Sequence, residues 1–253
     1  MPIKTAISQI LPGKILIRGY NLAEFIGRRS FGDIVYLLFT GELPQEREGE
    51  MIEAILVSSA DHGLTPPSTH TARAVANVGN PFQAAMAAGI LAIGEHHGGA
   101  GEACAYLLQE SVRAYPDDLP DALATRVVAE ARAQKRRLPG FGHRFHNPDP
   151  RAEQLLALAN ELGISGKHVA LAQAIAKELE RTTGRALPLN VDGAIAAILS
   201  DMGLDWRYGK ALFIIGRAAG MAAHVYEEMA TGTPFKFIAP LDVEYVGVKE
   251  REL

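Results

Sequence analysis

Apolar residues recur mainly at three- and four-residue spacing along the chain, the pattern of amphipathic helices. Ser30 with Asp33 three residues later resembles a capping box, and Gly41 followed by Pro44 ends the helix that begins there. Long alternating strands bounded by hairpin signals are missing, and only residues 14–18 are predicted to be extended. We therefore expect a mainly helical protein, with further helices over residues 45–60, 68–77, 81–93, 100–114, 120–136, 150–162, 167–183, 192–202 and 206–231.

Several of the predicted helices carry almost no charge, and residues 81–93 are the clearest case, built from Ala, Gly and Leu. A helix that is apolar on all sides must be buried on most of its faces. A chain of 253 residues has limited room for such helices in its own interior. We therefore predict a homodimer, in which a large subunit interface covers the remaining apolar surface.

Composition narrows the class of protein. The length fits one large domain or two small ones, and a net charge of −4 argues against nucleic acid as the main partner. Cys104 is the only cysteine, so an internal disulfide and a thiolate-rich metal site are excluded. No apolar run reaches the ~18 residues of a membrane span, and residues 1–9 lack a signal-peptide pattern. We expect a soluble cytoplasmic protein.

Four segments combine titratable groups with glycines or helix caps. They are A-D-H-G-L-T-P-P-S-T-H-T-A-R over residues 60–73, G-E-H-H-G-G-A-G-E over residues 94–102, L-P-G-F-G-H-R-F-H-N-P-D-P-R over residues 138–151 and L-N-V-D-G-A-I over residues 189–195. Arg217 lies downstream in an apolar helical run. A guanidinium in such a run needs an anion or several carbonyls, so a substrate carboxylate and a buried ion pair both remain open.

Structural interpretations also remain open for three other groups. Asp192 fits a plain helix N-cap, because Asp favours that position. His70 and His224 on their helices fit structural histidines as well as catalytic ones. The basic run at residues 135–137 is most simply a solvated helical turn.

His97 and His143 are stronger candidates for chemistry, because glycines beside them allow a ligand to approach the backbone closely. His97 precedes a helix that begins near Gly99, and the positive end of that helix should lower the pKa of the ring and keep it neutral.

Adjacent His96 and His97 cannot ordinarily aim both rings at one ion. We therefore predict no metal site.

Taken together and in this order, the segments resemble motifs of the citrate synthase superfamily. Residues 18–44 resemble its G-Y-x-x-x-E-L…S-F-x-x-V-x-Y-L-L-x-x-G-E-L-P segment, and H-G-G-A-G-E resembles H-G-G-A-N-E. The G-F-G-H-R-F-x-N-P-D-P-R, N-V-D-G and G-R-A-A-G-M-A-A-H-V-x-E stretches also have counterparts there. The resemblance covers nearly the whole chain and is closest to the short citryl-CoA lyase branch, which is similar to the C-terminal citrate-synthase-like part of ATP-citrate lyase.

The resemblance implies an all-α homodimer with a large domain, residues 1–98 and 204–253, and a small domain, residues 99–203, with the active site in the cleft between them. It implies acetyl-CoA or citryl-CoA and oxaloacetate as substrates. The CoA thioester is then a substrate, and no cofactor is expected. A citrate-activating protein is a further partner that it suggests. Nucleic acid and membrane partners are not expected.

The resemblance also implies catalytic roles for four residues. Making or breaking a bond to a thioester methyl group requires a carboxyl group and an oxyanion donor that act together. Asp192 matches the carboxyl group and His97 matches the neutral donor to the thioester oxygen. His143 matches the residue that polarises the keto oxygen or accepts the hydroxyl proton. His70 falls where the lyase branch has a functional histidine, so either His97 or His70, or both, holds the enolate oxygen.

Binding roles follow from the same resemblance. Arg151 and Arg217 match arginines that bind the substrate's carboxylates. His62 matches a binding histidine, and Arg144 is a further binding candidate. The loop matched to CoA binding consists of Leu138, Pro139, Gly140, Phe141 and Gly142.

Two departures from the synthases favour cleavage as the activity. The segment between Pro44 and Asp61 holds one helix, where full-length synthases carry a longer helical insertion, and Ala239 stands near the place of an arginine that crosses to the partner subunit. We therefore expect a citryl-CoA lyase-like enzyme. Citrate or 2-methylcitrate synthesis is the enzymatic alternative, and a non-catalytic CoA- or citrate-binding subunit is the alternative of another class.

Overall fold

The structure is a computed structural model that describes residues 2–143, 148–234 and 246. Its strands are β1 (Ser8–Leu11), β2 (Lys14–Ile17) and β3 (Tyr20–Asn21). Its helices are α1 (Leu22–Phe25), α2 (Phe31–Thr40), α3 (Glu46–Ser59), α4 (Pro67–Asn77), α5 (Phe82–Leu91), α6 (Ala100–Ala114), α7 (Pro120–Ala133), α8 (Pro150–Glu161), α9 (Lys167–Thr183), α10 (Val191–Asp201) and α11 (Tyr208–Thr231). The predicted helical architecture is confirmed.

The N-terminal strands form a small antiparallel sheet in the order β1-β2-β3. Leu11 pairs with Lys14 across the Pro12-Gly13 turn, so this turn closes a two-residue hairpin loop. The prediction of a single extended piece at residues 14–18, with no hairpin signal, was therefore wrong. All of β1 is exposed, so its side chains carry no inside–outside alternation from which a strand could be recognised.

Helix starts and ends follow local capping chemistry. The capping box of Ser30 and Asp33 is present, and the left-handed Gly41 ends α2 by donating its N–H to the Leu37 carbonyl. At α10 the cap differs from one reading of the sequence. The Asn190 side chain accepts the Gly193 N–H, so Asp192 lies inside the first turn and is not the N-cap. Its carboxyl group is therefore left for another role.

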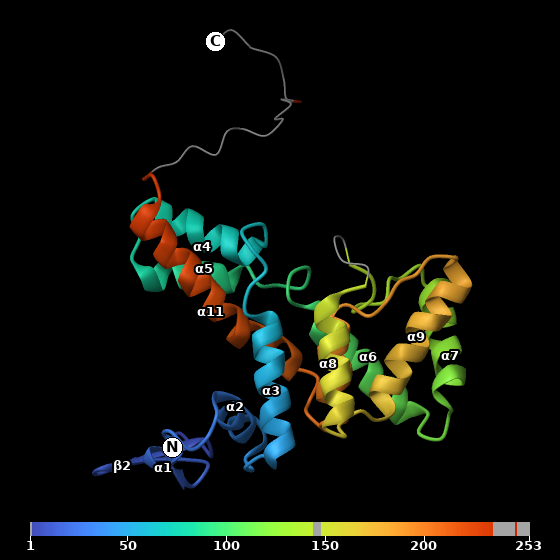
Figure 1. Ribbon diagram of the computed structural model, residues 1–253, viewed down its shortest axis with the longest axis horizontal. Coiled ribbons are helices and arrows are strands. Elements are labelled where there is room, and N and C mark those ends of the chain that lie inside the picture. Colours follow the sequence, from blue (N-terminus) through green and yellow to red (C-terminus); the bar gives the residue numbers. More distant parts are fainter. Residues whose placement is uncertain (1, 144–147, 235–245, 247–253) are drawn as a thin grey trace.

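Most of the helices pack as two neighbouring groups joined by α3 and α11 (Figure 1), while α1 and α2 lie with the N-terminal strands. Helices α6 to α10 form one group, with α10 at its centre, contacting α6, α8 and α9. Helices α4, α5 and the C-terminal part of α11 form the other. The main hydrophobic core runs from α3 through α6 and α10 to α7, α8 and α9, while Ala72, Ala76, Ala85 and Val225 form a smaller one.

The outer side of α5 is not covered by the described part of the chain. Leu91 is 84% exposed and Phe82 is 40% exposed, although the helix carries no charged residue. An apolar side chain gains about 1.5–3 kcal/mol on full burial, so this face favours a covering surface. No helix in the described ranges has the length and apolar character needed to cross a membrane.

Candidate active site

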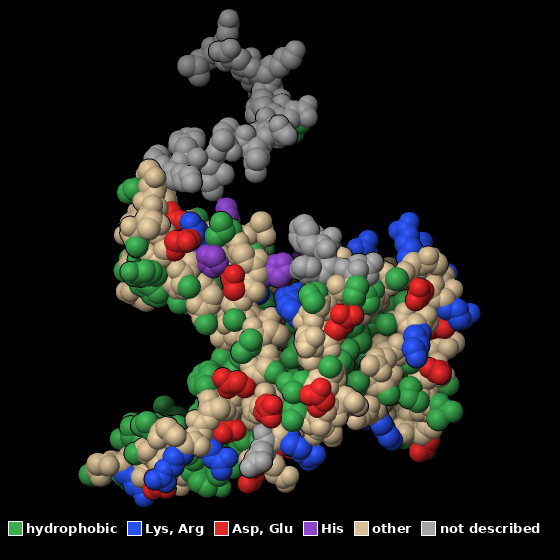
Figure 2. Space-filling model, in the orientation of Figure 1, with side chains coloured by type: hydrophobic (Ala, Val, Ile, Leu, Met, Phe, Trp, Pro, Cys, Tyr) green, Lys and Arg blue, Asp and Glu red, His purple; other side chains and the backbone are tan. Residues whose placement is uncertain are grey.

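A cavity of about 550 Å³ lies where the two helix groups meet. Figure 2 shows histidine side chains at and beside this junction, on one side of the molecule. The walls of the cavity come from the loop before α4, the turn before α6, the loop after α7 and the helices α8, α10 and α11. The lining residues are His62, Thr65, Pro66, Pro67, His96, His97, Gly98, Gly142, His143, Arg151, Asn190, Val191, Asp192, Phe213 and Arg217.

Backbone hydrogen bonds fix the loop that carries His143. Gly142 donates its N–H to the Pro188 carbonyl at 2.8 Å, and the Asn190 N–H reaches the Gly140 carbonyl at 3.1 Å. The Asn190 side chain also donates to the Gly142 carbonyl at 2.7 Å. The residue that caps α10 thus also anchors the loop, and it holds His143 close to the start of the helix that carries Asp192.

Asp192 occupies the first turn of α10 and lines the cavity. Burial raises the pKa of its carboxyl group; the charges of Arg151 and Arg217 act against this, and the nearby charge of Asp149 adds to it. A carboxyl group with a raised pKa holds its proton to higher pH. Such a group can give a proton to a carbanion or, once ionised, take one from a carbon acid.

Arg151 reaches the cavity from the first turn of α8, where a neighbouring carboxylate orients it. Its Nε donates to Oδ1 of Asp149 at 3.0 Å and its Nη2 donates to Oδ2 at 2.9 Å. Asp149 is the N-cap of α8 and is 1% exposed. A guanidinium has five N–H donors, so this two-point contact leaves three for a ligand.

His97 is held in one orientation by Ser68 at the start of α4. Its Nε2 lies 2.8 Å from the Ser68 hydroxyl and accepts the Ser68 backbone N–H at 3.4 Å. A backbone N–H can only donate, so Nε2 keeps its lone pair and the neutral ring carries its proton on Nδ1. Burial, followed by the charge of Arg217, lowers the pKa of His97. The sequence also predicts a lowered pKa for His97. That prediction rests on the N-terminus of the helix that begins near Gly99, whereas burial and Arg217 are the causes in the structure.

Arg217 is 2% exposed and extends from α11 to the cavity. Its Nε donates to the Ser59 carbonyl at 3.0 Å, and its guanidinium lies 4.9 Å from the ring centroid of Phe213. Within the described part of the chain it forms no ion pair, so the buried-ion-pair interpretation finds no support there. Burial lowers the pKa of Arg217, the charge of Asp61 opposes this, and an anionic ligand would relieve the cost of the buried charge.

The remaining predicted residues divide into three cases. His62 and His143 line the cavity with their ring centroids 5.7 Å apart. His70 is exposed on α4 and is not among the lining residues. Of the predicted CoA loop, Gly142 reaches the lining while Leu138, Pro139, Gly140 and Phe141 do not, and Arg144 lies outside the described residues.

Sequence reasoning assigned no role to Asp149, Ser68 or Phe213. Asp149 stands directly before Pro150 and Arg151, a typical N-cap position, so its place at a helix start could have been found from the sequence. Its contact with the start of α10 could not. Among the described residues no group of three or more His, Cys, Asp or Glu could hold a metal ion.

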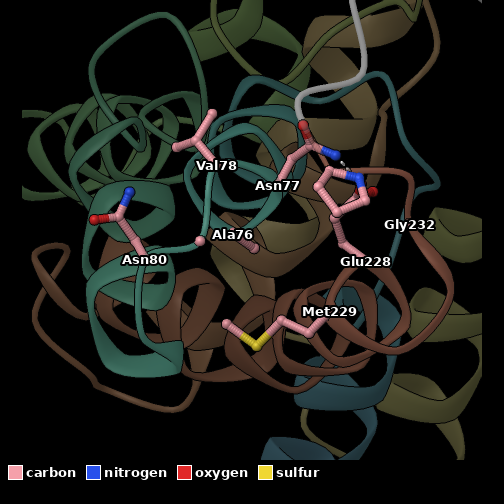
Figure 3. A pocket seen from close by; sticks show the side chains of 9 residues that line it. Ala76, Asn77, Val78, Asn80, Glu228, Met229 and Gly232 are labelled. Atoms are coloured by element: carbon pink, nitrogen blue, oxygen red, sulfur yellow. Dashed lines mark hydrogen bonds between the residues drawn. The ribbon is translucent and has the colours of Figure 1, made fainter.

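Two other cavities are less suited to chemistry. One of about 510 Å³ lies at the C-terminal ends of α4 and α11 (Figure 3). The carboxylate of Glu228 in its wall is already paired with Arg73 and accepts a hydrogen bond from Asn77. Another, of about 730 Å³, lies between α3 and α8 and contains no histidine. Of these three cavities, the one at the junction of the two helix groups brings histidines, arginines and a buried carboxyl group together.

A family model agrees with this geometry. The model of the citrate synthase C-terminal domain matches residues 45–238. A Mycobacterium tuberculosis protein named "Putative citrate synthase 2" is 37% identical over 209 residues, which cover 81% of this chain and 53% of that protein. The chain thus spans about half the length of the curated relatives it matches.

Solved structures also resemble this one. Citryl-CoA lyase from Hydrogenobacter thermophilus superposes with a TM-score of 0.91 and 46% identity, covering 99% of this chain and 97% of that one. A Thermoplasma acidophilum citrate synthase, in a ternary complex, has a TM-score of 0.73 at 24% identity and covers 88% of this chain and 58% of its own, so this likeness shows the fold alone. The expected citrate synthase-like fold is confirmed.

Proposed function

The chain belongs to the citrate synthase family, and we propose that it cleaves citryl-CoA to acetyl-CoA and oxaloacetate. The observation that carries this proposal is the meeting of Asp192, whose pKa is raised by burial, with His97, His143, Arg151 and Arg217 around one cavity. A likeness of 46% identity to a citryl-CoA lyase, over nearly the full length of both chains, supports the choice of reaction.

In the proposed reaction His143 accepts the proton of the citryl hydroxyl group. The electron pair of that O–H bond forms the keto group of oxaloacetate, and the carbon–carbon bond breaks. Its electron pair moves into the acetyl-CoA enolate, whose oxygen accepts a hydrogen bond from Nδ1–H of His97. Asp192 then gives its proton to the methylene carbon, which becomes the methyl group of acetyl-CoA. A positioned acid or base of this kind contributes about 10²–10⁴-fold in rate.

Arg151 and Arg217 bind the two free carboxylates of citryl-CoA, because each keeps N–H donors that the described contacts do not use. His62 and Arg144 assist them. The loop of residues 138–142 contacts CoA, with Gly142 nearest the reacting end. His70 on its exposed site is the less suitable of the two histidines proposed for the enolate oxygen.

The charge-free outer face of α5 is the proposed homodimer interface, because a second copy offers an equally apolar surface with no charge to bury. We also keep the division into a large domain, residues 1–98 and 204–253, and a small domain, residues 99–203. A cytoplasmic location and a separate citrate-activating protein belong to the same proposal.

Citrate synthesis is the second candidate, favoured by the 37% identity to the mycobacterial protein. The same groups would act in reverse, with ionised Asp192 as base. The two candidates are separated by incubating purified protein with citryl-CoA in one reaction, and with acetyl-CoA or propionyl-CoA plus oxaloacetate in another. We expect the first to yield oxaloacetate and acetyl-CoA. Thiol release in the second, with no cleavage in the first, would identify a synthase, and ligand binding without turnover would identify a non-catalytic subunit.

A further inference from the structure

Asp149 connects Arg151 at the start of α8 with Val191 at the start of α10, which is 42 residues from Asp149 in sequence. Its Oδ1 accepts the Arg151 backbone N–H at 3.1 Å and the Arg151 Nε–H at 3.0 Å. Its Oδ2 accepts the Arg151 Nη2–H at 2.9 Å and the Val191 backbone N–H at 3.0 Å. Four donors thus satisfy one carboxylate that is 1% exposed. A buried charge with this many partners is costly to replace.

The two elements that Asp149 joins both carry groups of the proposed reaction. Arg151 is in the first turn of α8, and the Asp149 contact fixes the plane of its guanidinium. Val191 is the first residue of α10, and Asp192 is the next. The bond to Val191 therefore sets how the start of α10 lies against the start of α8, and with it the distance between the arginine and the catalytic carboxyl group.

Asp149 also balances the charges around Asp192. The charged groups that act on Asp192 are Arg151 from α8, Asp149 before α8 and Arg217 from α11. The Cys104 thiol on α6 is instead a group on which Asp192 acts. Burial raises the pKa of Cys104 to about 12, so the thiol stays uncharged. Two arginines would draw Asp192 toward its ionised form, and Asp149 opposes them.

We propose that Asp149 is a positioning residue of this active site, one buried carboxylate that orients Arg151 toward the substrate and acts together with burial to disfavour the ionisation of Asp192. The inference rests on the proposed function. It adds a residue that does not line the cavity. It also identifies a negative charge that acts with burial, and against the two arginines, on the carboxyl group of Asp192.

The test uses Asp149→Asn, which keeps the shape and one acceptor oxygen but removes the charge and one acceptor of the two-point contact. Asp201→Asn is the matched control. Asp201 is also a buried carboxylate that joins two helices, accepting the backbone N–H groups of Gly166, His168 and Val169 at the start of α9. It is not among the residues that line the cavity.

In Asp149→Asn we expect the titration midpoint of Asp192 to fall, and the KM for citryl-CoA to rise by about 10- to 100-fold, since a buried donor loses its partner. The midpoint is measured in ligand-free protein by ¹³C-carboxylate NMR, with Asp192→Asn to assign the signal. Both Asp149→Asn and Asp201→Asn should lose stability, but Asp201→Asn should leave the midpoint and KM at the wild-type values.

The proposal is overturned if Asp149→Asn leaves both the midpoint and KM unchanged, or if Asp201→Asn moves them equally. A wild-type protein that does not turn over citryl-CoA would refute the proposed function instead. The NMR titration needs no substrate, so it still decides whether Asp149 controls the proton on Asp192.

Discussion

The close approach of Gly140 to α10 supports a quantitative prediction for Gly140→Ala. Gly140 has φ +86°, in the left-handed region, and an added Cβ would lie 2.8 Å from both Cys104 Sγ and Gly193 Cα. The backbone conformation alone costs a non-glycine residue about 1–2 kcal/mol, and overpacking of a tight contact costs about 1–3 kcal/mol more. We therefore expect a loss of about 2–5 kcal/mol in the free energy of unfolding.

Gly184→Ala is the matched control, because Gly184 has φ +67° but nothing within 4 Å of an added Cβ. It should cost only the conformational part, about 1–2 kcal/mol, and keep its activity. Both free energies are measured by denaturant unfolding. The Gly140 variant should also lose kcat/KM, because the loop that positions His143 is pushed away from α10. Equal losses of stability in the two variants would refute the close-packing argument.

Three further predictions concern the active site, acid stability and assembly. Asp192→Asn should lower kcat for citryl-CoA cleavage by about 10²–10⁴-fold. The rate of cleavage by the wild-type protein should decline as pH rises through the raised pKa of Asp192. A rate that stays constant at alkaline pH would count against the role of Asp192 as the acid. Burial alone would raise the pKa of Asp201, but hydrogen bonds from His168 and three backbone N–H groups outweigh it and lower that pKa. The contribution of Asp201 to stability is therefore full above the unfolded-state pKa and is lost as pH falls through the folded-state pKa. In Asp201→Asn the free energy of unfolding should depend less on pH in the acid range. Leu91→Asp should yield monomers in light scattering while Ile26→Asp, at a site 76% exposed, should not, and dimers of both variants would place the interface elsewhere.

Helices could be predicted from the sequence because their signals are local. The capping box at Ser30 and the left-handed stop at Gly41 each involve residues within one turn, and the structure has both. The strands β1 and β3 were missed because they are short and mostly exposed. The motif resemblance also identified His97, His143 and Asp192 as site residues, and the structure places all three at one cavity. Their catalytic roles stay predictions.

Tertiary contacts account for what the sequence could not predict. The Asn190 side chain that caps α10 also donates to the Gly142 carbonyl 48 residues away, a contact that local capping signals do not reveal. Asp149 contacts Val191 only because α8 and α10 pack together. His70 matches a motif, yet helix α4 places it on the surface, outside the lining of the cavity. Helical periodicity carries no information about such pairings.

The products formed from citryl-CoA test the central claim most directly. Purified protein is mixed with citryl-CoA in D₂O, and the CoA species are identified by mass spectrometry. We predict acetyl-CoA carrying one deuterium in its methyl group, with an equal amount of oxaloacetate and little free CoA, and a strongly reduced rate in Asp192→Asn. Citrate and free CoA as the products, or unchanged citryl-CoA, would contradict the proposed cleavage.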